Sequence, residues 1–183
     1  MVTTRTILLT ALTAAATLAP SSALAVAPQP TTPREGGLLP KLLTSRELWA
    51  TIDVCNPSNQ PDTVGIRGSM PGDGHARDRL YMSFGLQYQT AGSTTWVDLT
   101  TSGASTDFLA VGPAKTAGRQ DGTSFVIKPV TGKQPFTLRG VVNFQWRRGS
   151  SILERASRPT TVGHESLAGA DPKGYSAATC LIG

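Results

Sequence analysis

Residues 136–147 read FTLRGVVNFQWR. Apolar and polar side chains alternate along this stretch, and a period of two residues is the pattern of a strand with one buried face. Phe144 and Trp146 lie in the apolar phase, so we expect both to be core residues. Arg139 and Asn143 lie in the opposite phase and should point towards solvent. The stretch therefore predicts a long strand at the centre of a half-buried sheet.

The same period recurs in Leu80–Gln89. Leu80 begins the apolar phase, which ends at Tyr88, whereas Tyr81 belongs to the polar phase. Each of the two stretches buries one face. We therefore expect them to be the central core strands and to lie in one sheet.

The rest of the chain has shorter segments rich in β-branched residues, separated by turn signals such as Pro71-Gly72-Asp73-Gly74 and Asp121-Gly122. Arg148-Gly149-Ser150 predicts a tight hairpin. Leu43–Ala50 has room for one or two helical turns at most. We expect the weaker strands at Leu48–Cys55, Thr63–Met70, Thr95–Leu99, Ser105–Val111, Thr123–Lys128, Ile152–Ser157 and Ala177–Ile182. Short strands joined by Gly and Pro turns predict an all-β, two-sheet antiparallel sandwich of about 7–9 strands.

Residues 1–25 have the three parts of an export signal. Arg5 supplies a positive charge, an apolar segment follows, and Ala23-Leu24-Ala25 is a cleavage motif. The apolar segment is shorter than the roughly 20 residues of a membrane-spanning helix, and an uncleaved anchor is the less favoured alternative. We therefore expect a secreted, extracellular protein with no membrane span after cleavage.

Residues 26–37 are rich in Pro, Thr and Gly and should be flexible, because they cannot bury apolar surface. With the short apolar patch that follows, they make up a predicted spacer over residues 26–46. Residues 47–183 form the predicted sandwich domain. Loss of residues 1–25 leaves 16 basic and 12 acidic residues, a formal charge of +4. Such an excess serves solubility or a loose attraction to anionic cell-wall polymer.

Cys55 and Cys180 are the two cysteines of the chain. In an exported protein, a pair of cysteines is expected to form a disulfide. They lie in the first and last predicted strands, so the bridge should hold the last strand against the first. The apolar phase of Leu48–Cys55 places Cys55 on the opposite face from the other apolar residues. Either a bulge near Asp53 shifts the phase, or the bridge lies outside the main core, and we favour the second interpretation.

The long strand at 136–147, the Arg148-Gly149 hairpin and the strand Ile152–Ser157 resemble the last hairpin of immunoglobulin-like and fibronectin type III-like domains. Leu80–Tyr88, followed by Trp96-Val97-Asp98-Leu99, resembles their middle strand pair. This likeness of pattern covers residues 47–182, and the chain is also similar to uncharacterised secreted actinobacterial proteins. No Trp follows Cys55 at the distance usual in immunoglobulin domains. The cysteines are therefore not expected to form the inter-sheet core disulfide of that family.

Candidate catalytic and metal-binding residues are few. Gly-x-Ser-x-Gly is absent, and the chain has only His75 and His164. His75 lies between Asp73 and Asp78, residue types that also occur in Ser–His–Asp triads and in calcium or zinc sites. A solvated polar turn accounts for the same residues and is the favoured interpretation. We expect no catalysis, no metal and no cofactor.

Several outward aromatic and polar residues could contact a ligand. Trp146 shares the apolar phase and is excluded, and the aromatic fraction of 6 % is low for a sugar-stacking platform. The basic residues are spread through turns instead of forming a stripe, so nucleic-acid binding is not expected. The candidate ligand contacts are Trp49, Tyr81, Trp96, Arg139, Asn143 and Arg147. We expect a secreted, non-catalytic binding or structural module whose partner is a cell-wall polymer or another surface protein. The alternatives are a polysaccharide-binding module and, less favoured, a small secreted hydrolase.

Overall fold

The computed structural model describes residues 38–100, 107–115, 117–129, 132, 134–165 and 167–183. By its internal contacts the chain divides into Met1–Glu35 and Gly36–Gly183, and only the second unit is described below. The predicted export signal (1–25), most of the predicted spacer and the first two residues of the expected strand Ser105–Val111 lie outside the described residues.

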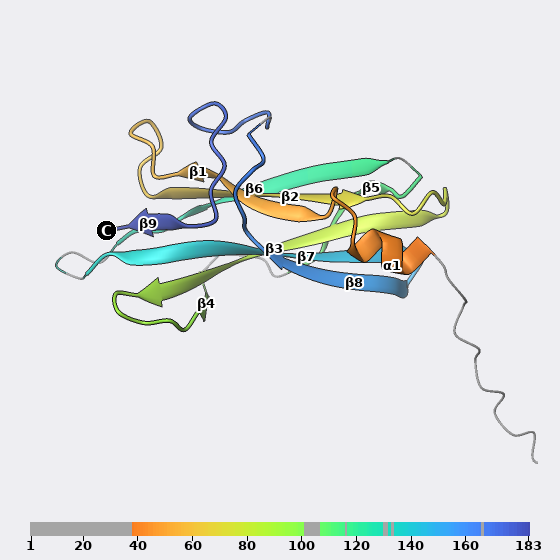
Figure 1. The fold of residues 1–183 in the computed structure, drawn as a ribbon, viewed down its shortest axis with the longest axis horizontal. Coiled ribbons are helices and arrows are strands. Elements are labelled where there is room, and N and C mark those ends of the chain that lie inside the picture. Colours follow the sequence, from red (N-terminus) through yellow and green to blue (C-terminus); the bar gives the residue numbers. More distant parts are fainter. Residues whose placement is uncertain (1–37, 101–106, 116, 130–131, 133, 166) are drawn as a thin grey trace, which may run out of the picture. The chain divides into compact units, whose positions relative to one another are not determined.

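Two antiparallel sheets face each other and form a sandwich (Figure 1). The three-stranded sheet has the order β1 (Trp49–Cys55), β2 (Thr63–Pro71), β6 (Gly118–Val126). The six-stranded sheet has the path β4 (Val97–Leu99), β3 (Asp78–Thr90), β7 (Phe136–Arg148), β8 (Ser151–Pro159), with β5 (Leu109–Pro113) on β3 and β9 (Cys180–Ile182) on β7. The described residues thus form nine strands, which confirms the predicted all-β sandwich.

The two long strands predicted to lie in one sheet are β3 and β7, and the structure makes them neighbours. They pair along their whole length, from Asp78 opposite Arg148 to Thr90 opposite Phe136. Their inward side chains are buried from Leu80 to Leu86 and from Leu138 to Trp146, as the apolar phase predicts, while Tyr88 and Phe136 at one end are partly buried. The indole Nε1 of Trp146 donates a hydrogen bond of 2.8 Å to the carbonyl oxygen of Pro71, at the end of β2. This bond satisfies the polar atom of the largest core side chain and links the two sheets.

The bulge near Asp53 is present, and the interpretation that we favoured is wrong. The register between β1 and β2 shifts between Ile52 and Val54. After the shift Cys55 lies opposite Val64, which is fully buried. Cross-strand partners share a face, so the bulge turns Cys55 towards the core.

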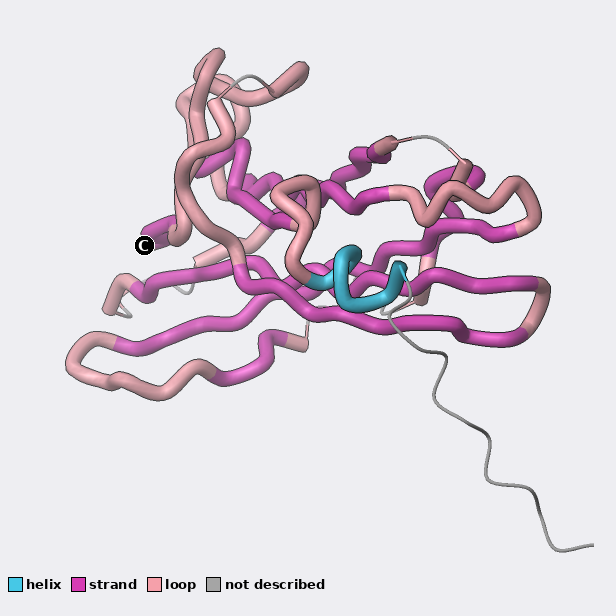
Figure 2. Tube along the Cα trace, turned by 45° about the vertical axis from the view of Figure 1, so that its right-hand side comes forward, coloured by secondary structure: helices cyan, strands magenta, loops and turns pink. Residues whose placement is uncertain are grey.

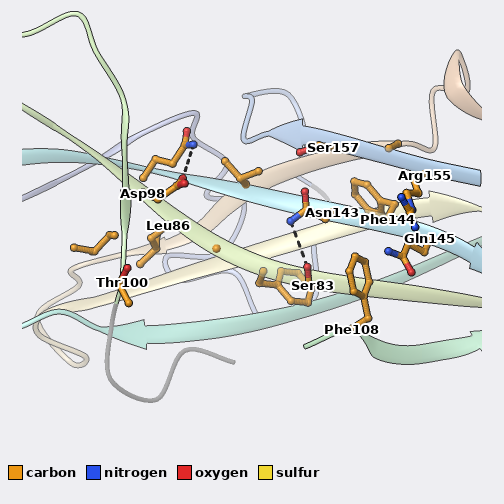
Figure 3. A pocket seen from close by; sticks show the side chains of 16 residues that line it. Ser83, Leu86, Asp98, Thr100, Phe108, Asn143, Phe144, Gln145, Arg155 and Ser157 are labelled. Atoms are coloured by element: carbon orange, nitrogen blue, oxygen red, sulfur yellow. Dashed lines mark hydrogen bonds between the residues drawn. The ribbon is translucent and has the colours of Figure 1, made fainter. Parts of the chain in front are cut away.

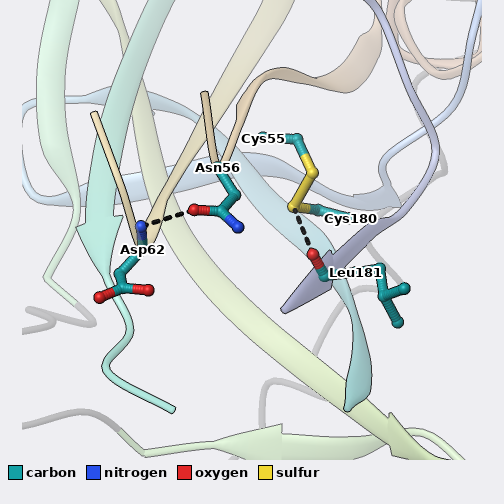
Figure 4. The surroundings of a disulfide bond; sticks show 5 residues. All are labelled: Cys55, Asn56, Asp62, Cys180 and Leu181. Atoms are coloured by element: carbon teal, nitrogen blue, oxygen red, sulfur yellow. Dashed lines mark hydrogen bonds between the residues drawn. A yellow bond between two sulfur atoms is a disulfide. The ribbon is translucent and has the colours of Figure 1, made fainter. Parts of the chain in front are cut away.

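The disulfide joins Cys55 to Cys180, as predicted (Figure 4). However, Cys180 is in β9, which pairs with β7 of the six-stranded sheet, whereas Cys55 ends β1 of the other sheet. The bridge is therefore an inter-sheet bond, contrary to expectation, and Cys180 is buried in the core.

The predicted last strand, Ala177–Ile182, divides between the two sheets. Ala177 exchanges two backbone hydrogen bonds with Ile52 of β1, of 2.9 and 3.0 Å. Three residues later the chain pairs with the end of β7 opposite Leu138. The last strand proper therefore pairs with β7, and within the predicted strand it is Ala177 that pairs with β1.

Two local predictions need correction. Asp121-Gly122 does not form a turn but lies inside β6, which begins at Gly118. A Cβ at Gly122 would lie 2.8 Å from the carbonyl oxygen of Ile66, so glycine here permits close approach of two strands. The helical turns expected in Leu43–Ala50 occur earlier, as α1 (Leu38–Leu43).

Helix α1 lies beside β8 in both views (Figures 1 and 2). Leu42 is buried in the core, and the guanidinium of Arg158 donates a hydrogen bond of 2.8 Å to the carbonyl oxygen of Leu43. Part of the stretch assigned to the spacer is therefore packed on the sandwich. Among the described residues, no helix has the length and apolar character needed to cross a membrane.

Candidate functional site

In the three-stranded sheet, the outer face of β1 is covered by the chain itself. The ring of Trp49 stacks on that of His164, with centroids 4.0 Å apart. The hydroxyls of Thr51 and Ser176 lie 2.8 Å apart. Asp53, which is also buried, accepts a hydrogen bond of 2.8 Å from Arg67. Residues of the segment between β8 and β9 thus occupy the surface over β1, and the six-stranded sheet is taken as the candidate binding face.

We use "outer face" for the solvent-directed positions of β3, β7 and β8 in the six-stranded sheet. Because cross-strand neighbours share a face, these positions form transverse rows. The polar rows are Arg79–Arg147, Tyr81–Gln145–Arg155, Ser83–Asn143–Ser157 and Gln87–Arg139. The row Gly85–Val141–Pro159 interrupts them and is apolar, as is Ile152 opposite Arg147. Polar side chains therefore predominate along the two long strands, as the sequence period predicts.

A pocket of about 720 Å³ opens on this face (Figure 3). Its floor comes from β3 and β7, and its sides come from β8, from the end of β4 and from Phe108. Asn143 donates a hydrogen bond of 3.3 Å to Ser83 at its centre. At one end the amide of Gln87 donates to Asp98, at 2.8 Å. The lining therefore combines hydroxyl and amide groups with apolar side chains, among them Phe108, Leu99 and Val141.

Two arginines of β7 stack on aromatic rings beside the pocket. The guanidinium carbon of Arg139 lies 4.4 Å from the centroid of the Trp96 ring, and that of Arg147 lies 4.2 Å from Tyr81. Arg147 also lies 5.1 Å from the centroid of Phe108. Each arginine donates its Nε–H, at 2.7 Å, to a glutamine oxygen of the outer face, Gln87 for Arg139 and Gln145 for Arg147. Stacking and the hydrogen bond together hold each guanidinium in one orientation.

The structure brings five of the six predicted contact residues to this face. They are Tyr81, Trp96, Arg139, Asn143 and Arg147. Trp49 is separate, because it lies on the three-stranded sheet against His164.

Sequence reasoning misses Phe108 and Arg155. Phe108 precedes β5 in a stretch without a period of two, so no pattern marks its orientation. Arg155 lies in a predicted strand, but a register shift between Trp146 and Arg147 in the pairing of β7 with β8 obscures its phase.

Asp73, His75 and Asp78 lie at one end of the sandwich, with potential ligand atoms within 4.8 Å of one another. Asp78 accepts two hydrogen bonds from Arg148, of 2.6 and 2.8 Å, which lower the pKa of its carboxyl. Burial raises the pKa of Asp73. Arg148 already balances the charge of the buried Asp78. An ion pair beside a turn therefore accounts for the cluster of Asp73, His75 and Asp78.

The two imidazoles lie in different surroundings. Nδ1 of His75 is 3.5 Å from a carboxylate oxygen of Asp73, and its ring is exposed. The ring of His164 is stacked on Trp49, and burial lowers its pKa against an opposing effect of Glu165. Among the described residues, neither imidazole is hydrogen-bonded to a Ser or Thr hydroxyl.

Comparison with models of known protein families gave no match, and no curated protein is significantly similar to the chain in sequence. The function is therefore inferred from the geometry of the outer face.

Proposed function

We propose that this protein is a secreted, non-catalytic binding module with an immunoglobulin-like sandwich, and that the outer face is its contact surface. The observation that carries the proposal is the convergence of five predicted contact residues on one sheet face: Asn143 lines the pocket, and Arg139 and Arg147, with their aromatic partners, are hydrogen-bonded to lining residues. Over β1, the face of the other sheet is occupied by the chain's own C-terminal segment, which favours the outer face.

Export is supported by the Cys55–Cys180 disulfide, since such bonds persist in oxidising compartments. A non-catalytic role is supported by the surroundings of the two histidines. Neither imidazole has the hydroxyl partner that a hydrolytic triad needs, among the residues that the structure describes.

A polysaccharide of the cell wall is the candidate ligand that the pocket favours over a surface protein. Ser83, Asn143 and Ser157 form a row of small polar groups across its floor. Hydroxyl and amide side chains of this kind pair with sugar hydroxyls, whereas the buried centre of a protein interface is depleted of serine.

The test is a binding assay with the full chain, expressed with its own N-terminal segment and recovered after export. It is applied to cell-wall fractions and to immobilised glycans over a range of salt concentrations. Asn143→Tyr fills the pocket floor and should abolish binding. Gln120→Tyr introduces the same ring at an exposed position of β6, in the other sheet, and should leave binding unchanged.

Equal binding by wild type and Asn143→Tyr, with both folded by circular dichroism, would place the contact surface elsewhere. Binding that disappears at moderate salt for every anionic fraction alike would indicate charge attraction alone.

A further inference from the structure

The outer face is strongly one-sided in charge. Its outward positions carry Arg79, Arg139, Arg147 and Arg155, and no Asp or Glu occupies an outward position of these three strands. None of the ion pairs among the described residues involves these four arginines. Asp98 of β4 also lines the pocket, where it accepts a hydrogen bond from Gln87, and offsets one of these four charges. The face and its pocket therefore retain an excess of positive charge.

Part of this charge is placed unfavourably for the protein alone. Arg79 and Arg147 lie directly opposite each other in the pairing of β3 with β7. Like charges at directly opposed positions of a sheet destabilise it. A bound anion between the two side chains would remove this repulsion.

The orientation of the arginines also favours an anion. The rings of Trp96 and Tyr81 each carry a guanidinium over one face, which limits that face as a stacking surface for a sugar. The Nε–H of each arginine is already hydrogen-bonded. The terminal N–H groups remain to bind two oxygens of one carboxylate, the geometry for which a guanidinium is suited.

The positions of the arginines indicate a long ligand. Arg139 and Arg147 are eight residues apart on one strand. At about 3.3 Å per residue this separation is about 26 Å. Ser83 and Asn143 lie between them and offer hydroxyl and amide groups. The backbones of β3 and β7 are already paired on both sides along much of their length, so the face recognises a ligand through side chains and not by strand addition.

We propose that the outer face binds a linear polysaccharide that carries carboxylate groups along its chain. Arg139 binds a carboxylate at one end of the pocket, and Arg147, with Arg79 and Arg155, binds carboxylates at the other. The small polar groups between them bind sugar hydroxyls. The inference deepens the proposed function and rests on it, because it names the ligand class of the same surface.

Polygalacturonate and its fully methyl-esterified form are the probes, since they share a backbone and differ in charge. The full chain should bind the acid form at least about tenfold more tightly than the ester, because one hydrogen bond to a charged group contributes about that factor to affinity. Arg139→Gln and Arg147→Gln should each weaken binding of the acid form about tenfold and leave the weak binding of the ester unchanged. Arg77→Gln, at an exposed loop position, is the matched control and should have no effect.

Arg139→Lys and Arg147→Lys separate oriented recognition from simple charge. Lysine keeps the charge but loses the planar fork, so both variants should bind nearly as weakly as the glutamine variants. Full binding by the lysine variants would overturn the proposed geometry.

The remaining outcomes decide the ligand class. Equal affinity for the acid and the ester forms of the polymer would overturn the inference that the ligand carries carboxylates. If that binding is still lost in Asn143→Tyr, the proposed function of the outer face as the contact surface would stand. Tighter binding of polyglutamate, of single-stranded DNA or of a phosphodiester polymer than of polygalacturonate would also overturn it. Loss of all binding to wall fractions and glycans would instead remove the proposed function itself.

Discussion

Cys55 and Cys180 join two strands that belong to opposite sheets of the sandwich. Cys55 ends β1, and Cys180 begins β9, which pairs with β7. The bond closes a loop of 125 residues and fixes the C-terminal segment at the point where it passes from one sheet to the other. In the chain-entropy account, closing a loop of this length makes the unfolded chain less favourable by about 5 kcal/mol at room temperature.

We expect the double variant Cys55→Ser, Cys180→Ser to lose several kcal/mol, up to about 5 kcal/mol, of the free energy of unfolding. The measurement is urea denaturation followed by intrinsic fluorescence, with reduced wild type as the control. Reduced wild type and the variant should agree. A loss below about 1 kcal/mol would contradict the view that the bond is a main constraint on the unfolded chain.

Gly140 and Gly85 give a matched pair of tests for the packing between the sheets. Both lie in the paired long strands, but a Cβ at Gly140 would lie 2.7 Å from atoms of Ile66 and of Thr160. A Cβ at Gly85 would meet only the carbonyl oxygen of Val141, at 3.9 Å.

Gly140→Ala should therefore lower the free energy of unfolding by about 1–3 kcal/mol through overpacking. Gly85→Ala should be neutral or stabilising by up to about 1 kcal/mol, since alanine restricts the unfolded chain. Chemical denaturation measures both. Equal effects of the two substitutions would show that the sheets do not approach each other closely at Gly140.

The sequence predicts the two-sheet fold because the period of two in β3 and β7 reflects burial of one face. This period also places Arg139, Asn143 and Arg147 on one surface, which is most of the candidate site. It carries no information on which ring each arginine will meet. The contact of Arg139 with Trp96 depends on how β4 folds back on β3, a relation between distant parts of the chain.

The path of the C-terminal segment could not be predicted for a related reason. The sequence around Ala177 and Cys180 is compatible with one strand, and nothing local shows that it changes sheet between them. The bulge near Asp53 is different, because the phase of Leu48–Cys55 indicates it as one of two explanations. The burial of Asp53 under the C-terminal segment and its ion pair with Arg67 are non-local, so β1 alone could not decide between the two.

We expect the exported protein to begin at Val26 and to contain no free thiol. Cleavage after Ala25 follows from the small residues that precede it, and the disulfide forms once the chain leaves the reducing cytoplasm. The intact mass and the N-terminal sequence of the protein in the culture medium show whether it begins at Val26. Thiol alkylation without reductant shows whether it contains a free thiol. An intact N-terminus on membrane-bound material would support the uncleaved anchor instead.

The ion pair between Asp78 and Arg148 should make stability depend on pH in acid solution. Hydrogen bonds from Arg148 lower the pKa of Asp78 below its ordinary value of 3.8. The carboxylate therefore contributes stability that is fully present above the unfolded-state pKa and is lost as the pH falls through the folded-state pKa. Asp78→Asn should lower the melting temperature at pH 7 and at pH 5 by similar amounts, and the difference from wild type should shrink below pH 3.8.

Asp73 should change the pH dependence of stability in the direction opposite to Asp78, and it therefore provides an internal control for that prediction. Burial raises its pKa above 3.8, so its protonation favours the folded state as the pH falls towards that value. Asp73→Asn should remove this gain and raise stability at pH 7, where the buried carboxylate is unfavourable. Asp98→Asn, at an exposed position, controls for the loss of one negative charge. If Asp78→Asn destabilises the protein equally at pH 7 and well below pH 3.8, the lowered pKa of Asp78 is not linked to folding, and the bond to Arg148 has no net stabilising role.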